Sequence, residues 1–182
     1  MTDNQQNDVP EDFAKLDGQP CPMCMKNTLS LTEFSRDVPF FGKVFVFSMS
    51  CSSCDYHKSD VEPAEQGTPC KYTMDISSEE DMKVRVVKSS AATIKIPRMV
   101  NIESTAGSNG YVTNVEGLLN RFKKILEGLR DEAEDKSDRK KAKNMLKKLQ
   151  DAMWGRDTIK LIIEDPSGNS AIISEKAVKS KL

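Results

Sequence analysis

The sequence has little of what most enzymes and membrane proteins use. It contains a single histidine, and it lacks a phosphate-binding glycine loop, a dinucleotide fingerprint, a nucleophile elbow and a zinc-protease motif. No apolar run approaches the ~20 residues that cross a bilayer, and the amino terminus lacks the basic and apolar segments of a secretion signal. The 27 basic and 28 acidic residues leave a net charge of only −1, which argues against broad coating of nucleic acid or anionic membrane. We therefore expect a soluble, cytoplasmic, non-enzymatic protein with no membrane partner.

Cysteine is the informative residue type. Five cysteines in a compartment that keeps thiols reduced are poor material for disulfides, so their spacing points to metal or redox chemistry. Cys21-Pro-Met-Cys24 and Cys51-Ser-Ser-Cys54 form two C-x2-C pairs, and each pair can hold a tetrahedral ion from one tight turn. Four thiolates close the coordination shell, which predicts one structural Zn²⁺, although the same ligands suit iron.

Other interpretations of the cysteines are open. Cys21 and Cys24 could form a redox pair, but such pairs normally begin a helix after a strand. Pro20-Cys21-Pro-Met-Cys24 also resembles half of a zinc-deaminase motif, without the upstream H-x-E. His57 lies three residues after Cys54 and could replace a ligand; we favour a position at the surface or beside a ligand. Cys70 is expected to be a small buried apolar residue away from the metal.

Composition divides the chain into four stretches. Residues 1–17 are predicted to form a flexible acidic tail, since few apolar side chains are present to offset the entropy of ordering. Residues 18–62 are predicted to form the metal-binding ribbon, in which a hairpin of Leu29–Phe34 and Lys43–Met49 brings the cysteine pairs together. Residues 63–175 are predicted to form a β-rich domain, and 176–182 a C-terminal tail. The alternation in Lys83–Lys88 and Thr93–Ile96 favours half-buried antiparallel strands, and Thr158–Ile163 and Ala171–Ile173 are further predicted strands.

An antiparallel helical hairpin is expected at about 114–154, inside the β-rich domain. Thr113-Asn-Val-Glu116 has the form of a capping box, and Gly155 ends the second helix. The first apolar stripe consists of Val115, Leu118, Leu119, Phe122, Ile125, Leu126 and Leu129. The second consists of Ala142, Met145, Leu146, Leu149, Ala152 and Met153. Trp154, at the helix exit, is expected to bury its ring against the hairpin or the sheet.

Together these residues resemble the ZPR-type zinc-finger proteins, over about residues 18–175. The resemblance rests on Cys21-Pro-x-Cys24, Val38-Pro-Phe-Phe41, Cys51-x-x-Cys54-x-Tyr56, Val87–Pro97, Thr113-x-Val-Glu-Gly-Leu-Leu119 and Asp165-Pro-Ser-Gly-Asn-Ser170. It implies a mixed α+β fold: a four-cysteine zinc ribbon followed by a double-stranded β-helix-like domain with an inserted helical hairpin. Family members usually have glycine after the second cysteine of each pair, where Met25 and Asp55 stand here. Met tolerates a left-handed backbone poorly and Asp tolerates it better.

The resemblance also implies a function. By this resemblance, the chain would be a binding partner and folding chaperone of translation elongation factor 1-alpha. A single-module, archaeal-like member would act on the archaeal counterpart of that GTPase. Two segments could contact such a partner, and each has a structural alternative. The aromatic segment, Pro39–Phe41, could instead fill the junction between the ribbon and the β-domain. The segment that begins at Asp165 could be a plain hairpin turn. Their candidate residues are Pro39, Phe40, Phe41, Asp165, Pro166, Gly168 and Asn169.

A lysine-rich run in the second predicted helix supports an alternative function. It could bind RNA, the ribosome or an acidic protein surface, or it could be a solvated face that keeps the protein soluble. The run lacks the interleaved aromatic residues that stack on single-stranded bases. Its members are Lys136, Arg139, Lys140, Lys141, Lys143, Lys147 and Lys148.

Overall fold

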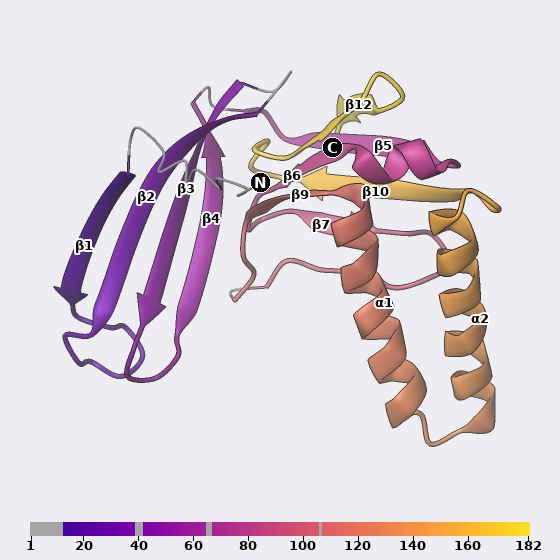
Figure 1. The fold of residues 1–182 in the computed structure, drawn as a ribbon, viewed down its shortest axis with the longest axis horizontal. Coiled ribbons are helices and arrows are strands. Elements are labelled where there is room, and N and C mark those ends of the chain that lie inside the picture. Colours follow the sequence, from indigo (N-terminus) through magenta and orange to yellow (C-terminus); the bar gives the residue numbers. More distant parts are fainter. Residues whose placement is uncertain (1–12, 39–41, 65–66, 106) are drawn as a thin grey trace, which may run out of the picture.

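The computed structural model describes residues 13–38, 42–64, 67–105 and 107–182. It consists of a four-stranded sheet on one side and a β-domain with a helical hairpin on the other (Figure 1). Neither helix within these ranges has the length and apolar character that crossing a bilayer requires.

The four-stranded sheet, called the ribbon sheet here, is an antiparallel meander with the strands in chain order. Its strands are β1 (Phe13–Gln19), β2 (Leu29–Val38), β3 (Gly42–Cys51) and β4 (His57–Pro63). The predicted hairpin is confirmed, and its strands extend further than expected, from the Leu29 and Cys51 pair to the Val38 and Gly42 pair. This pairing sets the second cysteine pair beside the start of β2.

Strand β1 corrects the prediction of a tail as far as residue 17. Phe13 lies opposite Phe34 and Leu16 lies opposite Leu31 in the antiparallel ladder with β2. Almost every residue of β1 is exposed, so no burial pattern marks the strand in the sequence. Backbone pairing with β2 holds it in the sheet instead.

The β-domain contains two further antiparallel sheets. One has the order β12-β5-β10-β7-β8 and the other the order β11-β6-β9. The strands are β5 (Cys70–Ile76), β6 (Arg85–Lys88), β7 (Thr93–Lys95), β8 (Asn101–Ile102), β9 (Tyr111–Asn114), β10 (Ile159–Asp165), β11 (Ala171–Ile173) and β12 (Val178–Lys181). A short 3₁₀ helix, η1 (Glu79–Lys83), precedes β6. Strand β12 corrects the predicted C-terminal tail, since its Val178 pairs with Thr73 of β5.

Strand β6 departs from the predicted half-buried alternation. Val86, Val87 and Lys88 are all buried, one after another. Val86 belongs to the main core, whereas Val87 belongs to a second cluster with Val44 and Val61 of the ribbon sheet. Both faces of β6 are therefore covered, because the strand lies between the main core and the ribbon sheet.

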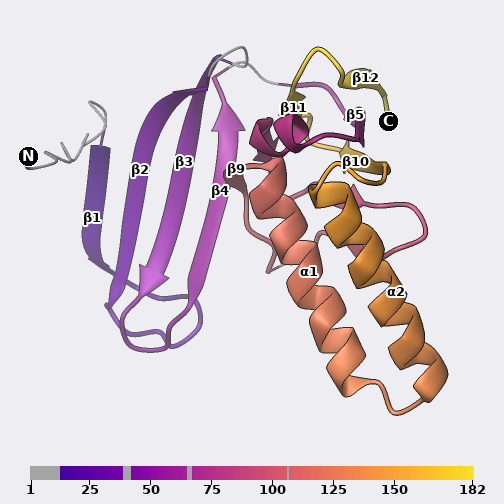
Figure 2. The ribbon, with the colours of Figure 1, turned by 45° about the vertical axis from the view of Figure 1, so that its right-hand side comes forward.

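The helices α1 (Val115–Glu132) and α2 (Lys136–Met153) form the predicted hairpin, which extends away from the sheets (Figure 2). The helix N-cap is Asn114, one residue after the predicted Thr113, and its side chain accepts a 2.8 Å hydrogen bond from the Gly117 amide. At the turn between the helices, the Arg139 guanidinium donates to the Ala133 carbonyl at 3.1 Å.

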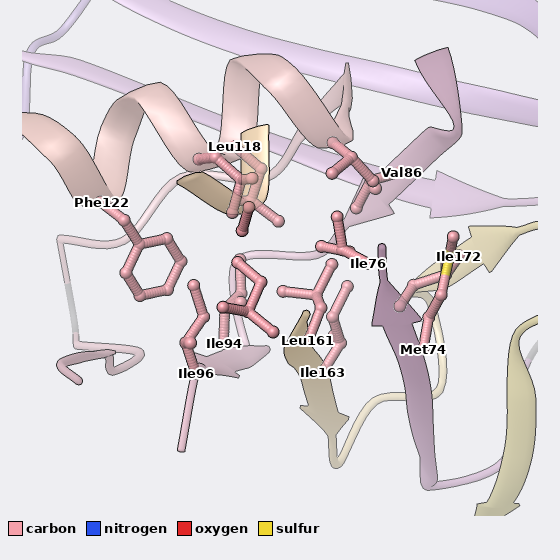
Figure 3. Close-up of a cluster of buried hydrophobic side chains, with 14 of the residues drawn as sticks. Met74, Ile76, Val86, Ile94, Ile96, Leu118, Phe122, Leu161, Ile163 and Ile172 are labelled. Carbon is pink, nitrogen blue, oxygen red and sulfur yellow. The ribbon is translucent and has the colours of Figure 1, made fainter. Parts of the chain in front are cut away.

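The main core lies between α1 and the strands of the β-domain. Leu118 and Phe122 point from α1 toward Ile94, Leu161 and Ile163 (Figure 3). Two members of the predicted first stripe, Ile125 and Leu129, are exposed, whereas Leu126 between them is fully buried in the core. Trp154 is also 50% exposed rather than buried, and the Arg156 guanidinium lies 4.7 Å from its ring centre.

Candidate metal centre

Each cysteine pair lies in a tight backbone turn at one end of the ribbon sheet. In the first turn the Cys21 amide donates to the Lys26 carbonyl at 2.9 Å. In the second, the Cys51 amide donates to the Tyr56 carbonyl at 2.8 Å. A backbone amide also donates to the first sulfur of each pair at 3.4 Å, from Met23 to Cys21 and from Ser53 to Cys51. The turns are thus built alike, and both direct N–H groups at sulfur, where negative charge is stabilised.

The four sulfur atoms converge on one point. Cys21 Sγ lies 3.7 Å from Cys54 Sγ, and Cys24 Sγ lies 3.7 Å from Cys51 Sγ. All four atoms lie within 4.8 Å of one another. Tetrahedral coordination at a metal–sulfur distance of ~2.3 Å places sulfur atoms ~3.8 Å apart, which matches both close pairs. The four predicted cysteines are therefore positioned to bind one metal ion.

The electrostatics of the cluster favour a bound cation. The Thr28 hydroxyl, 3.2 Å from Cys51 Sγ, is the main reason that the pKa of Cys51 is lowered to about 6. The Tyr56 amide lowers the pKa of Cys54, but partial desolvation and the neighbouring sulfurs outweigh it and raise that pKa to about 12. Four adjacent thiols cannot all ionise on their own at neutral pH, because each added thiolate repels the others. A divalent cation at the centre removes that repulsion and holds all four as thiolates.

Met25 and Asp55, at the positions where the resemblance implies glycine, both adopt left-handed backbone. The φ angle is +60° at Met25 and +54° at Asp55, each directly after the second cysteine of its pair. Met25 is 80% exposed, so its side chain gains little packing in return. The geometry that favours glycine is retained, and the strain falls on Met25 more than on Asp55.

His57 and Cys70 lie away from the cluster. His57 is exposed, and its Nδ1 lies 3.0 Å from the Ser50 hydroxyl. Cys70 is buried, as predicted, with its Sγ 4.0 Å from the Ser170 carbonyl. Among the residues that the structure describes, the ligand cluster comprises Cys21, Cys24, Cys51 and Cys54.

Two contacts that the sequence did not single out support the centre. Thr28 approaches Cys51, as described above, and the Lys26 ammonium donates to the Ser53 hydroxyl at 3.1 Å. The second contact joins one turn to the other across the site. Both residues lie within four positions of Cys24. Their closeness in sequence to a metal-binding cysteine is the feature from which their role could have been predicted.

The predicted partner residues divide into two groups. Pro39, Phe40 and Phe41 lie outside the described residues, between the end of β2 and the start of β3. The second group lies in the turn between β10 and β11, within the described residues.

Asp165 has no exposed surface and organises the turn that follows it. It accepts hydrogen bonds from the Ser89 hydroxyl at 2.9 Å, the Ser167 amide at 2.8 Å and the Ser167 hydroxyl at 2.7 Å. Gly168, at φ +75°, is buried where a Cβ would come within 2.4 Å of the Thr68 carbonyl oxygen. Pro166 is exposed and Asn169 half-buried. Of the four predicted contact residues in this turn, Pro166 and Asn169 therefore present side-chain surface, while Asp165 and Gly168 maintain its shape.

Comparison with known proteins bears directly on this arrangement. A model of the ZPR1 zinc-finger domain matches residues 16–69, and a model of the ZPR1 jelly-roll domain matches residues 80–181. The chain belongs to the ZPR1 family. The ribbon sheet with its four cysteines is the zinc ribbon, and the double-stranded β-helix-like domain that the family resemblance implied is the jelly roll.

Relatives from archaea and eukaryotes match over different shares of their lengths. A ZPR1-like protein of Methanocaldococcus jannaschii is 41% identical over 91% of this chain and 83% of its own length. A ZPR1-like protein of Pyrococcus horikoshii is 34% identical over 95% of this chain and 80% of its own. The zinc finger chaperone zpr1 of Schizosaccharomyces pombe is 28% identical over 84% of this chain but only 33% of its own. The chain thus spans most of the archaeal relatives and about a third of this yeast one.

Proposed function

We propose that this ZPR1-family chain is a non-enzymatic, zinc-dependent protein-interaction module of the cytoplasm. In this proposal it binds the archaeal counterpart of translation elongation factor 1-alpha and assists its folding. The observation that carries the proposal is the convergence of four cysteine sulfurs, because four protein ligands leave a tetrahedral ion no open position for water or substrate. The family name supports Zn²⁺ as the ion. The yeast relative's name, zinc finger chaperone, supports a protein client.

The metal would act by fixing the shape of a docking surface. Its ligands lie in the two turns at the ends of β1–β2 and β3–β4, so one ion ties together connections from both halves of the ribbon sheet. A small sheet with little core of its own gains folding free energy from metal binding. The candidate contact residues are Pro39, Phe40 and Phe41, together with Pro166 and Asn169 of the turn after β10.

Retention of the purified elongation factor on the immobilised full-length chain tests the proposal. We expect retention that persists at moderate salt, falls about tenfold or more in F40A or F41A, and is lost after chelation. F13A is the control, since Phe13 is an exposed aromatic residue of β1 in the ribbon sheet. A refolding assay, in which the chain raises the yield of active elongation factor, tests the chaperone step. Absence of retention by metal-loaded protein, or retention unaffected by chelation, would contradict the proposal.

A second candidate function rests on the exposed cations of α2. Lys136, Arg139, Lys140, Lys143, Lys147 and Lys148 are all exposed, as is Lys141, which pairs with Asp138 at 2.8 Å. This surface would suit RNA or the ribosome. Binding of a duplex or single-stranded RNA that weakens steeply with salt, and disappears when Lys140, Lys141 and Lys143 are changed to Glu, would favour it. Changing the exposed Lys179 and Lys181 to Glu provides the control.

A further inference from the structure

A pocket separate from the metal centre lies where α1 meets β6 and β9. Its volume is about 600 Å³, within the range of small-ligand sites. The helix contributes Asn120, Arg121 and Lys124, while the strands and the loop before β9 contribute Lys88, Asn109 and Tyr111. Three of these side chains are cationic, and no carboxylate of the described residues lines the pocket. The lining therefore concentrates positive charge in a chain whose net charge is −1.

The cations gather around one aromatic ring. The Arg121 guanidinium lies 4.0 Å from the centre of the Tyr111 ring, and Lys88 Nζ lies 5.6 Å from the same centre. Lys88 and Tyr111 face each other in the β6–β9 ladder. Arg121 and Lys124 are three residues apart on α1, so their side chains emerge from the same helix face. Arg121 and Lys88 thus meet at the Tyr111 ring from two elements, and Lys124 lines the same pocket from the helix.

Lys88 is the unusual member of the group. It is only 2% exposed, and lysine is seldom buried without a charged partner. Its ammonium donates to two neutral acceptors, the Ser89 carbonyl at 2.9 Å and the Asn109 carbonyl at 3.4 Å. An ammonium carries three donors, so one remains.

Carboxylates near Lys88 do not neutralise the pocket. Within the described ranges, Lys88, Arg121 and Lys124 have no carboxylate within the 4.0 Å of an ion pair. Burial lowers the pKa of Lys88, and the more distant carboxylates of Asp165 and Asp60, which act to raise it, do not offset that effect. Each of these carboxylates is already engaged, Asp60 by Ser90 and Asp165 by Ser89. The charge of Lys88 therefore lacks a close counter-ion.

We propose that this pocket binds the phosphate group of a small ligand. A phosphate carries nearly two negative charges and three acceptor oxygens, which suits a guanidinium and two ammonium groups better than a single carboxylate does. The amides of Asn109 and Asn120 and the hydroxyl of Ser108 supply further donors. Ile102 and Ile125 add an apolar part to the lining, so the pocket has room and surface for an organic group attached to the phosphate. This site goes beyond the proposed client binding and does not depend on it.

Titration of the metal-loaded, full-length chain with inorganic pyrophosphate, AMP and adenosine at constant ionic strength tests the proposal. We expect pyrophosphate and AMP to shift the amide resonances of Asn109, Asn120 and Lys124, and adenosine to leave them in place. Tighter binding of AMP than of pyrophosphate would assign the phosphate to an organic ligand, and the reverse would assign it to a free phosphate.

Two variants make the result specific to the pocket. R121Q and K124Q alter exposed helix residues, and each is expected to weaken pyrophosphate binding about tenfold. K140Q removes one exposed positive charge from α2 and is expected to leave binding unchanged. K88M tests the buried ammonium, and the two helix variants decide the outcome if K88M does not fold. Absence of any shift at millimolar pyrophosphate, or equal weakening in K140Q, would overturn the proposal, and neither result bears on client retention.

Discussion

The Sγ atoms of Cys21 and Cys54 lie 3.7 Å apart, although 33 positions separate the two residues in the chain. Cys24 and Cys51 form the second cross-pair, also at 3.7 Å. Each turn therefore contacts the other through both of its sulfurs, and the Lys26 to Ser53 hydrogen bond adds a third link. The metal site fixes how the two connections of the ribbon sheet sit against each other, which is the physical basis of the proposed docking surface.

Glycine at the two left-handed positions is expected to stabilise the zinc ribbon. M25G removes the Cβ strain of a residue at φ +60°, worth about 1–2 kcal/mol, while the more flexible unfolded chain offsets about 0.4–1 kcal/mol. We expect a net gain of about 0–1.6 kcal/mol in unfolding free energy for M25G, and a smaller gain for D55G because Asp tolerates this region. Urea unfolding of the metal-loaded protein measures both.

M23G is the matched control for M25G. Met23 is 69% exposed in the same turn, and its φ is not positive. Glycine there relieves no strain and only loosens the unfolded chain, so M23G is expected to lower the unfolding free energy. Destabilisation by M25G equal to that by M23G would show that the strain at Met25 is absent.

The buried Asp165 carboxylate is expected to contribute to stability and to its pH dependence. D165N leaves donors from Ser89 and Ser167 facing an amide group, which costs about 2 kcal/mol or more. Burial raises the pKa of Asp165, but the hydrogen bonds from Ser170, Ser167 and Ser89 outweigh it and hold that pKa below its ordinary value of 3.8. The stabilisation is therefore complete above the unfolded-state pKa and is lost as pH falls through the lower, folded-state pKa.

Denaturant unfolding of wild type and D165N between pH 6 and pH 2 measures this contribution. The difference in unfolding free energy should be constant above about pH 5 and shrink on acidification. D75N is the control, since Asp75 is exposed and its ion pair with Lys160 is long, at 3.6 Å. It should change the unfolding free energy by less than ~0.5 kcal/mol. A difference between wild type and D165N that grows at low pH would refute the assignment.

Much of this architecture could be predicted from the sequence where chemistry or periodicity constrains it. The C-x2-C spacing identified all four cysteines of the cluster, because metal ligation demands both the residue type and the short turn. The helical stripes identified the hairpin, since Leu118 and Phe122 recur on the face that meets the core. The strand run at Thr158–Ile163 corresponds to β10, whose Ile159, Leu161 and Ile163 are buried in alternation.

What the sequence did not predict depends on backbone pairing or on tertiary position. β1 and β12 are exposed along almost their whole lengths, so their places follow from pairing with β2 and β5 rather than from any apolar pattern. Trp154 is half exposed, with its ring against the Arg156 guanidinium, although the C-terminal end of α2 returns to the β-domain. Lys88 is buried because β6 is covered on both faces. The alternation of apolar and charged residues in Lys83–Lys88 predicts only one covered face, so it could not reveal this burial.

The contact between the zinc ribbon and the jelly roll is expected to couple the two parts. Val87 is fully buried against Val44 and Val61 of the ribbon sheet, so V87A removes two methyl groups from that contact. We expect a loss of about 2 kcal/mol in unfolding free energy, with faster amide hydrogen exchange in β4 and β9. V178A, at an exposed position of β12, is the control and should have little effect. Unchanged exchange in β4 would argue against coupling through this cluster.

The metal content of the purified chain, measured together with the order of the ribbon sheet, tests the central claim most directly. We expect one Zn²⁺ per chain by elemental analysis, lost in C24S and C51S but retained in C70S, whose cysteine lies outside the cluster. Removal of the ion should raise hydrogen exchange across β1–β4 while the core around Phe122 stays protected. A metal-free chain whose ribbon sheet is as protected as that of the metal-loaded chain would contradict the account.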